Sequence, residues 1–297
     1  MLRSDAPEIR MRALEGLAAS GSPHAAAWCI WALTDSDPGV REAARTSLRQ
    51  LSSDDLANAV IAVIGWGDAA EATALVSALP SLCGILERNV LERFQSSDTP
   101  RIERIAGAYC LGRMGSRLAS EMLAQAVWSD DAELSAYCAD ALMNIDDSSL
   151  LRHFARMCTH ESPSIRIVAY QGLARIGGPE AHRIIADAAA GKTESDTAAR
   201  RIAVRMLGYV GDHTSVEPLM GHIRARNQFV RPAIDALATL TGFSNSLARE
   251  RWIEWYDEVW KPAVEAAQRS EAPPPPLVPK QRYVPPGFPK QGFPFIP

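Results

Sequence analysis

Aromatic residues are scarce in this chain of 297 residues. They make up 7% of the sequence although 47% is hydrophobic, because alanine and leucine dominate the apolar residues. Such a composition is typical of helices that pack closely on one another. At this length we expect either two domains or one extended repeat architecture. The composition favours the repeat architecture.

An excess of positive charge is also lacking. The formal net charge is -4 and the isoelectric point is about 5.9. Proteins that bind nucleic acid or anionic lipid without sequence specificity rely on a basic surface. We therefore do not expect nucleic acid as a partner.

Paired cysteines and long apolar runs are missing as well. Two of the longest apolar runs, "AAAWCIWAL" and "LANAVIAVIGW", are shorter than the roughly 20 residues that span a bilayer. The first residues contain no apolar segment typical of a signal peptide. The cysteines are odd in number and none has the close spacing of a zinc or redox motif; they are Cys29, Cys83, Cys110, Cys138 and Cys158. These observations predict a cytoplasmic protein without membrane insertion.

A repeat of about 31 residues runs through most of the chain. Clear copies begin at residues 7, 38, 100, 163 and 196, and weaker copies cover 70–82, 132–146 and 229–242. Each copy has one anchoring leucine, and these are Leu17, Leu48, Leu79, Leu111, Leu142, Leu173, Leu207 and Leu237. A second apolar segment lies between successive copies. Each unit is therefore predicted to be a helical hairpin that buries its apolar face against its neighbours.

Small and aliphatic residues accompany the anchoring leucines at fixed distances. Four residues before the leucine lies a small residue, such as Ala44 or Ala169, and eight before lies an aliphatic one, such as Ile9 or Ile165. These spacings place all three on one helical stripe. Proline opens several copies, at Pro7, Pro38, Pro100 and Pro163, and glycine closes others in a predicted left-handed cap, at Gly21, Gly115, Gly177 and Gly211.

The segments "PSIRIVAYQGLARIGGPEA" and "RRIAVRMLGYVGDHTSVEPL" resemble HEAT repeats, especially the short bacterial kind found in phycobilisome-lyase-like proteins. The resemblance covers about residues 5–243 and is weakest over residues 54–98. It implies a right-handed all-α solenoid of about seven to eight hairpins. It also implies a scaffold for protein–protein interactions, and it does not imply an activity.

The end of the repeat array has its own pattern. The segment "LTGFSNSLARERWIEWYDEVW" resembles the tryptophan helix that closes bacterial HEAT arrays. Ala248, Trp252, Trp255 and Val259 fall on one helical stripe, which suits a hydrophobic cap on the last repeat. The predicted domains are a solenoid over residues 1–243, a capping helix over 244–270 and an extended tail over 271–297.

Arginine recurs seven residues before the leucine in five copies, at Arg10, Arg41, Arg104, Arg166 and Arg200. Acids just before the helices, such as Asp35, Asp37, Glu161 and Asp196, suit ion pairs with this ladder or helix caps. A phosphate-binding strip would need unpaired arginines. A denser basic cluster at Arg201 and Arg205, beside the inserted loop "AGKTESD", is a candidate partner contact.

Residues that would carry catalysis or bind a metal are not evident. His24, His153, His182 and His213 recur near helix starts, but no carboxylate or cysteine recurs beside them in ligand spacing. The resemblance to deoxyhypusine hydroxylase is limited because that enzyme needs several His-Glu pairs and this chain has one, His160-Glu161. We predict no enzyme activity, no cofactor and no small-molecule substrate.

The C-terminal tail does not fit the repeat. Residues 272–297 contain ten prolines, no acids and three basic residues, and such a segment favours an extended chain. "PKQRYVPP" is echoed by "PKQGFPFIP". Spaced aromatic residues on an extended chain are typical of a docking peptide. The predicted partner-binding residues of the tail are Lys280, Arg282, Tyr283, Phe288, Lys290, Phe293 and Phe295. A tail folded back on its own solenoid and a disordered spacer are the alternatives.

The sequence therefore predicts a non-catalytic scaffold or accessory subunit that binds one or more proteins of a larger assembly, with its tail docked on a partner. The alternative is an enzyme or cofactor-handling protein that resembles phycobilin lyases or HEAT-like glycosylases and uses a charged groove. Removal of residues 271–297 is expected to leave the melting temperature unchanged and to abolish partner binding.

Overall fold

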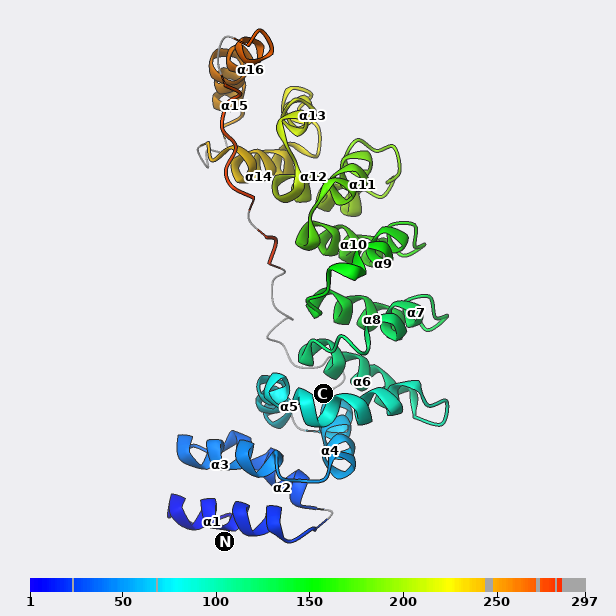
Figure 1. Ribbon diagram of the computed structural model, residues 1–297, viewed down its shortest axis with the longest axis vertical. Helices are drawn as coiled ribbons and strands as arrows, with labels where there is room; N and C mark the ends of the chain where they lie inside the picture. The colour runs from blue at the N-terminus through cyan, green and yellow to red at the C-terminus, as the bar shows by residue number, and fades with distance from the viewer. Residues whose placement is uncertain (23, 68, 244–247, 271–272, 281, 285–297) are drawn as a thin grey trace. The chain divides into compact units, whose positions relative to one another are not determined.

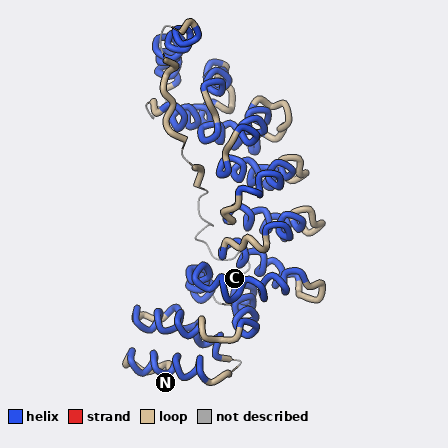
Figure 2. The backbone as a smooth tube through the Cα atoms, in the orientation of Figure 1, coloured by secondary structure: helices blue, strands red, loops and turns tan. Residues whose placement is uncertain are grey.

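The computed structural model describes the chain except for residues 23, 68, 244–247, 271–272, 281 and 285–297. The described residues form helices joined by loops, with no strand among them (Figure 2). They divide into two units, Met1–Asp147 and Ser148–Pro285. The predicted all-α class is confirmed.

The first unit is built of stacked helical pairs. Its elements are α1 (Pro7–Ala19), α2 (Ala25–Trp31), the 3-10 turn η1 (Ala32–Thr34), α3 (Pro38–Leu48), α4 (Ser53–Trp66), α5 (Ala69–Gln95), α6 (Arg101–Met114), α7 (Ser120–Ala126) and α8 (Ala132–Asn144). The helices that carry the anchoring leucines stack on each other, α1 on α3 and α6 on α8, and the intervening helices pack beside them.

The second unit repeats this arrangement. It contains the 3-10 turn η2 (Ser148–Leu150), α9 (Leu151–Met157), α10 (Pro163–Ile176), α11 (Pro179–Ala189), α12 (Thr197–Val210), α13 (His213–Arg224), α14 (Val230–Thr241), α15 (Arg249–Trp255), the π-helical turn η3 (Tyr256–Trp260) and α16 (Lys261–Gln268). Helices α10, α12 and α14 form one layer, and α9, α11 and α13 pack against it (Figure 1).

The predicted stripe forms the core in both units. Every anchoring leucine except Leu17 is at most 2% exposed, and the small residues Ala44, Ala169 and Ala203 are fully buried beside them. Ile9 is the exception among the aliphatic positions because it is 41% exposed. No described helix covers its side of α1.

One weak repeat copy was predicted wrongly. The repeat pattern predicts one helix over 70–82 and a separate helix in the apolar segment that follows, but α5 continues through Pro80 as one helix of 27 residues. The reason is the spacing of its apolar residues, since Leu75, Leu79, Leu82, Leu86 and Val90 form one continuous stripe and all are fully buried. The free energy gained by burying this stripe exceeds the free energy lost because Pro80 cannot donate a backbone hydrogen bond.

Helix α5 is also the one described helix that could cross a membrane by length and composition. Its most apolar window has a mean hydropathy of 1.3, and 33% of that window is buried. Core helices of soluble proteins meet the same criteria, and α5 packs on α4 and α6. The absence of membrane insertion stays a prediction.

The capping segment differs from its predicted stripe in two positions, the first being Ala248, which is exposed and precedes α15. Trp252 is fully buried and Trp255 is 9% exposed, as expected, but Val259 is 57% exposed and Trp260 is buried instead. The π-helical turn η3 accounts for this change. A π turn contains one residue more than an α turn, so the inward position moves from Val259 to Trp260.

The predicted glycine caps are only partly left-handed. Gly115 closes α6 with a φ of 68°, and Gly21 and Gly177 also have positive φ. Gly211 was assigned wrongly, because it follows α12 with a φ of −64°. Its backbone is extended there, and an added Cβ would still overlap the Leu207 carbonyl.

Candidate docking surface

The C-terminal ends of α10, α12 and α14 form a row along one side of the second unit. The last four carbonyls of a helix have no partner within the helix, and the end of the helix carries a partial negative charge. Arg175, Val210 and Leu240 lie in these last turns. A stack of such ends offers hydrogen-bond acceptors to any chain that runs across it.

The described part of the tail runs across these ends (Figure 1). We call residues 273–280 and 282–284 the strap. The Val278 N–H donates to the Leu240 carbonyl at 3.0 Å, Lys280 Nζ to the Val210 carbonyl at 3.0 Å and Arg282 Nε to the Arg175 carbonyl at 3.3 Å. Val278, Lys280 and Arg282 thus each donate a hydrogen bond to the end of one helix.

Tyr283 anchors the strap. It is 7% exposed, and its ring lies edge-on to Tyr209 with centroids 5.1 Å apart. Gln171 Nε2 donates to the Tyr283 hydroxyl at 3.0 Å. Burial raises the pKa of Tyr283, and Arg205 partly offsets this by its positive charge. The structure therefore brings together Tyr283 and Arg205, two residues that the sequence analysis singled out separately.

The root of the strap is held by His213, whose Nε2 donates to the Pro275 carbonyl at 2.8 Å. The same ring stacks on Trp260 with centroids 5.7 Å apart. Val278 lies over Gly242, where an added Cβ would come within 2.8 Å of Val278 Cγ2. The tail thus begins at the capping segment and follows the helix ends toward α10.

The structure places the predicted partner-binding residues in three groups. Lys280, Arg282 and Tyr283 contact the second unit of their own chain, as in the folded-back alternative. Arg201 and Arg205 are exposed on α12. Phe288, Lys290, Phe293 and Phe295 lie outside the described residues, so their role stays a prediction.

Sequence reasoning missed Gln171 and Tyr209. Tyr209 lies two residues after the anchoring leucine of α12, and Gln171 lies two residues before that of α10. Both positions lie beside the buried stripe. The distance of each position from its leucine predicts that it lies beside the stripe. That both residues contact Tyr283 is evident only from the course of the strap.

The arginine ladder is mainly structural. Arg10 binds Asp35 through two hydrogen bonds of 2.8 and 2.9 Å, and Arg166 binds Glu194 in the same way at 2.7 and 2.9 Å. Arg200 donates to the Ala189 carbonyl. The predicted pairing with acids is confirmed for Asp35. Arg166 differs from the prediction, because its carboxylate partner is Glu194 of the inserted loop and not Glu161.

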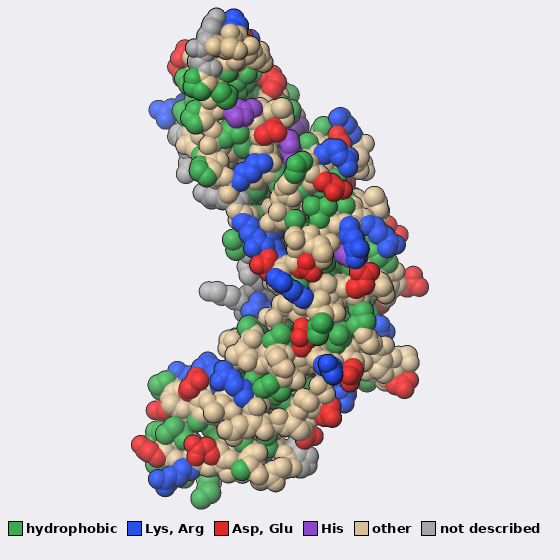
Figure 3. Space-filling model, viewed as in Figure 1, with side chains coloured by type: hydrophobic (Ala, Val, Ile, Leu, Met, Phe, Trp, Pro, Cys, Tyr) green, Lys and Arg blue, Asp and Glu red, His purple; other side chains and the backbone are tan. Residues whose placement is uncertain are grey.

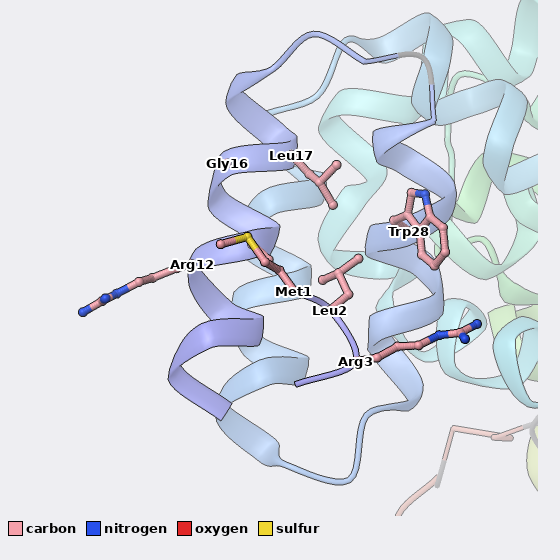
Figure 4. A pocket seen from close by; sticks show the side chains of 8 residues that line it. Met1, Leu2, Arg3, Arg12, Gly16, Leu17 and Trp28 are labelled. Carbon is pink, nitrogen blue, oxygen red and sulfur yellow. The ribbon is translucent and has the colours of Figure 1, made fainter. Parts of the chain in front are cut away.

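Two open hollows lie at α1 and α2 of the first unit. The larger, of about 650 Å³, is lined by Met1, Leu2, Arg3, Arg12, Ala13, Gly16, Leu17 and Trp28. Leu2, Leu17 and Trp28 converge on it, whereas Arg12 points away (Figure 4). The smaller, of about 550 Å³, contains the Arg10–Asp35 ion pair.

The cysteines are unsuited to nucleophilic chemistry. All five are free thiols. Burial raises the pKa of Cys29 to about 11 and those of Cys110 and Cys138 to about 12, so these thiols stay protonated at neutral pH. Within the described ranges, no three His, Cys, Asp or Glu side chains gather in a way that could hold a metal ion.

Comparison with solved structures gives distant similarities. An engineered protein has a TM-score of 0.40 and 18% identity, over 80% of this chain and 76% of that one. The complex of CpcE and CpcF of phycocyanin lyase from Nostoc sp. PCC7120 has 0.35 and 17%, over 80% and 94%. Human deoxyhypusine hydroxylase has 0.28 and 16%, over 89% and 98%. These similarities carry no information about an activity of this chain.

No curated protein matches the sequence. Residues 1–80 match the family model of HEAT repeats, and this segment contains α1 to α4 and the first part of α5. Both units continue with stacked helical pairs of the same kind. Residues 1–80 thus match HEAT repeats, and the rest of the described chain continues as stacked helical pairs.

Proposed function

We propose that this protein is a non-catalytic scaffold subunit whose C-terminal tail docks on a partner protein. HEAT-repeat solenoids typically mediate protein–protein interactions, which supports the general role. The observation that carries the finer proposal is the strap. Tyr283 is buried and three helix ends bind residues that precede it, so the described part of the tail is fixed to the second unit as far as α10.

The two halves of the tail then have different roles. Lys280, Arg282 and Tyr283 anchor the tail to its own chain. Phe288, Lys290, Phe293 and Phe295 follow the anchor, and these four residues are proposed to contact the partner, with Arg201 and Arg205 beside the strap. A fixed starting point lowers the entropy lost when such a segment binds.

The enzyme alternative lacks support in the described residues. Two of the five ladder arginines, Arg10 and Arg166, are paired with carboxylates, and the buried thiols are protonated. Free cysteines fit a reducing compartment, so we propose that the protein works in the cytoplasm as a non-catalytic component.

The test is a truncation after Pro285 in a protein with an N-terminal tag. Purification from the native host with quantitative mass spectrometry is expected to show at least a tenfold loss of the partner. A triple variant, Phe288→Ala with Phe293→Ala and Phe295→Ala, should give the same loss. Val284→Ala is the matched control because Val284 is 79% exposed on the strap, and it should retain the partner.

The strap also changes which deletion is informative. Removal of residues 271–297 takes away the buried Tyr283 ring and its hydrogen bonds, so it is no longer expected to leave the melting temperature unchanged. Truncation after Pro285 keeps the strap. If the partner is retained after this truncation, the tail is not its docking segment and the proposal is wrong.

A further inference from the structure

The surface beneath the strap has the properties of a peptide-docking site. It offers a row of helix-end carbonyls on α10, α12 and α14, and next to them the ring of Tyr209 and the amide of Gln171. Partial negative charge at the helix ends favours cations. The strap matches this pattern with Lys280 and Arg282, two residues apart, followed by an aromatic ring.

The strap is held at few points. Of its described residues only Tyr283 is buried, while Pro279, Lys280 and Arg282 are exposed. The helices beneath bury their own cores independently, since Leu173, Leu207 and Leu237 are at most 2% exposed against neighbouring helices. A ligand with few anchors on a rigid surface can be exchanged without unfolding the surface.

One residue pattern also occurs twice in the tail sequence. Residues 279–283 read Pro-Lys-Gln-Arg-Tyr, and residues 289–293 read Pro-Lys-Gln-Gly-Phe. Both place a lysine after a proline and an aromatic residue three positions after the lysine. The repetition indicates that the pattern itself, and not one unique segment, is what the surface recognises.

We propose that the ends of α10, α12 and α14 form a docking surface for an extended, proline-flanked segment of a partner protein that carries lysine or arginine followed by tyrosine or phenylalanine. Residues 278–280, 282 and 283 of the strap occupy it as a built-in ligand that the partner segment displaces. The inference rests on the proposed scaffold function, and it names a second contact, separate from residues 286–297.

The charge and the spacing of acceptors on this surface favour an extended basic segment over an acidic or helical one. An acidic segment would be repelled by the partial negative charge of the three helix ends. A helical segment would not present donors at every second residue, as the strap does at Val278, Lys280 and Arg282. An extended proline-rich segment loses little conformational entropy on binding.

The experiment uses the full chain and a fluorescein-labelled peptide with the sequence LVPKQRYV, which is that of residues 277–284. Binding is measured by fluorescence anisotropy. In the native chain the strap competes from the same molecule at an effective concentration of about millimolar. Tyr283→Ala loosens the strap, so the peptide is expected to bind this variant at least tenfold more tightly than the native chain.

Four further measurements test the result. Phe293→Ala is added to both chains so that residues 289–293 do not refill the surface. Tyr209→Ala, combined with Tyr283→Ala, should weaken the peptide at least tenfold because the aromatic contact is lost. A peptide with glutamate at the two basic positions should not bind. Lys280→Ala with Arg282→Ala, both exposed, opens the strap without removing a buried ring and should also strengthen peptide binding.

Two results would overturn the proposal. Peptide binding that is equal in the native and opened chains, or that does not depend on Tyr209, means that the surface is not a docking site. Self-association of the Tyr283→Ala chain that disappears with Phe293→Ala means that a second copy is the occupant. Neither result bears on the truncation after Pro285, so failure of this inference is distinguishable from failure of the proposed function.

Discussion

Glu194 shows how a single residue of the inserted loop holds two helices of the second unit. Its side chain is 1% exposed. It accepts hydrogen bonds from Arg166 Nε at 2.7 Å, from the Tyr170 hydroxyl at 3.0 Å and from the Asp196 N–H at 2.8 Å. A buried carboxylate is costly unless it is paired and hydrogen-bonded. Here all the partners come from α10 and from the start of α12.

The pKa of Glu194 gives this network a pH dependence. Burial alone would raise the pKa, but the hydrogen bonds from Arg166, Asp196 and Tyr170 outweigh it, so the pKa lies below its ordinary value of 4.5. Because the folded-state pKa is lowered, the stabilisation is complete above about pH 4.5 and is lost as the pH falls through the folded-state value.

Glu194→Gln should lower the free energy of unfolding by about 2 kcal/mol at pH 7, since a neutral amide replaces a carboxylate that accepts charge-assisted bonds. The difference from the native chain should shrink at pH 3. Urea unfolding at both pH values measures it. Glu42→Gln is the control, because Glu42 is 61% exposed in its pair with Arg45, and it should change the free energy by less than about 1 kcal/mol. An equal loss at both pH values would contradict the assignment.

At the scale of elements, glycine sets how closely the helices approach. Gly172 of α10 faces the ring of Phe154 on α9, and a Cβ added there would overlap that ring. Phe154 is 1% exposed, so the ring has no free space to move into. The close approach of α9 and α10 therefore depends on this glycine.

Gly172→Ala should destabilise the second unit by about 1–3 kcal/mol through overpacking. Gly221→Ala in α13 is the matched control, because Gly221 is exposed and nothing lies within 4 Å of its added Cβ. Alanine there should stabilise the helix by about 0.5–1 kcal/mol, since glycine is the poorer helix former. Thermal unfolding of the two variants should give shifts of opposite sign, and two shifts of the same sign would contradict the packing argument.

The anchoring leucines predicted most of the elements from sequence, because burial at a fixed helical spacing leaves a periodic signal. The exceptions have physical causes. The weak repeat copy over 70–82 predicted a helix end near residue 82, but the buried stripe of α5 continues through it. The prediction that Val259 is buried in the cap was wrong, because the residue types do not indicate a π turn. The docking of Tyr283 could not be predicted, since it meets Gln171 across 112 positions of the chain, and periodicity carries no information at that distance.

At the scale of the whole molecule, charge is balanced locally as well as in total. Basic and acidic side chains are intermixed over the visible face (Figure 3). The ladder arginines Arg10 and Arg166 are paired with Asp35 and Glu194, and Arg101 contacts both Asp131 and Glu133. A polyanion gains affinity only from cations that are free to release its counterions. These three arginines are therefore not free to bind a polyanion.

The full chain should accordingly elute from a heparin column at or below about 0.15 M salt, where surface charges are already screened beyond about 8 Å. The double variant Glu217→Gln with Asp257→Asn leaves Arg224 without its two carboxylate partners and raises the net charge by two, so it should elute at a higher salt concentration than the native chain. Retention of the native chain beyond about 0.5 M salt would show a strong polyanion site and would contradict the assignment of the arginine ladder to structure.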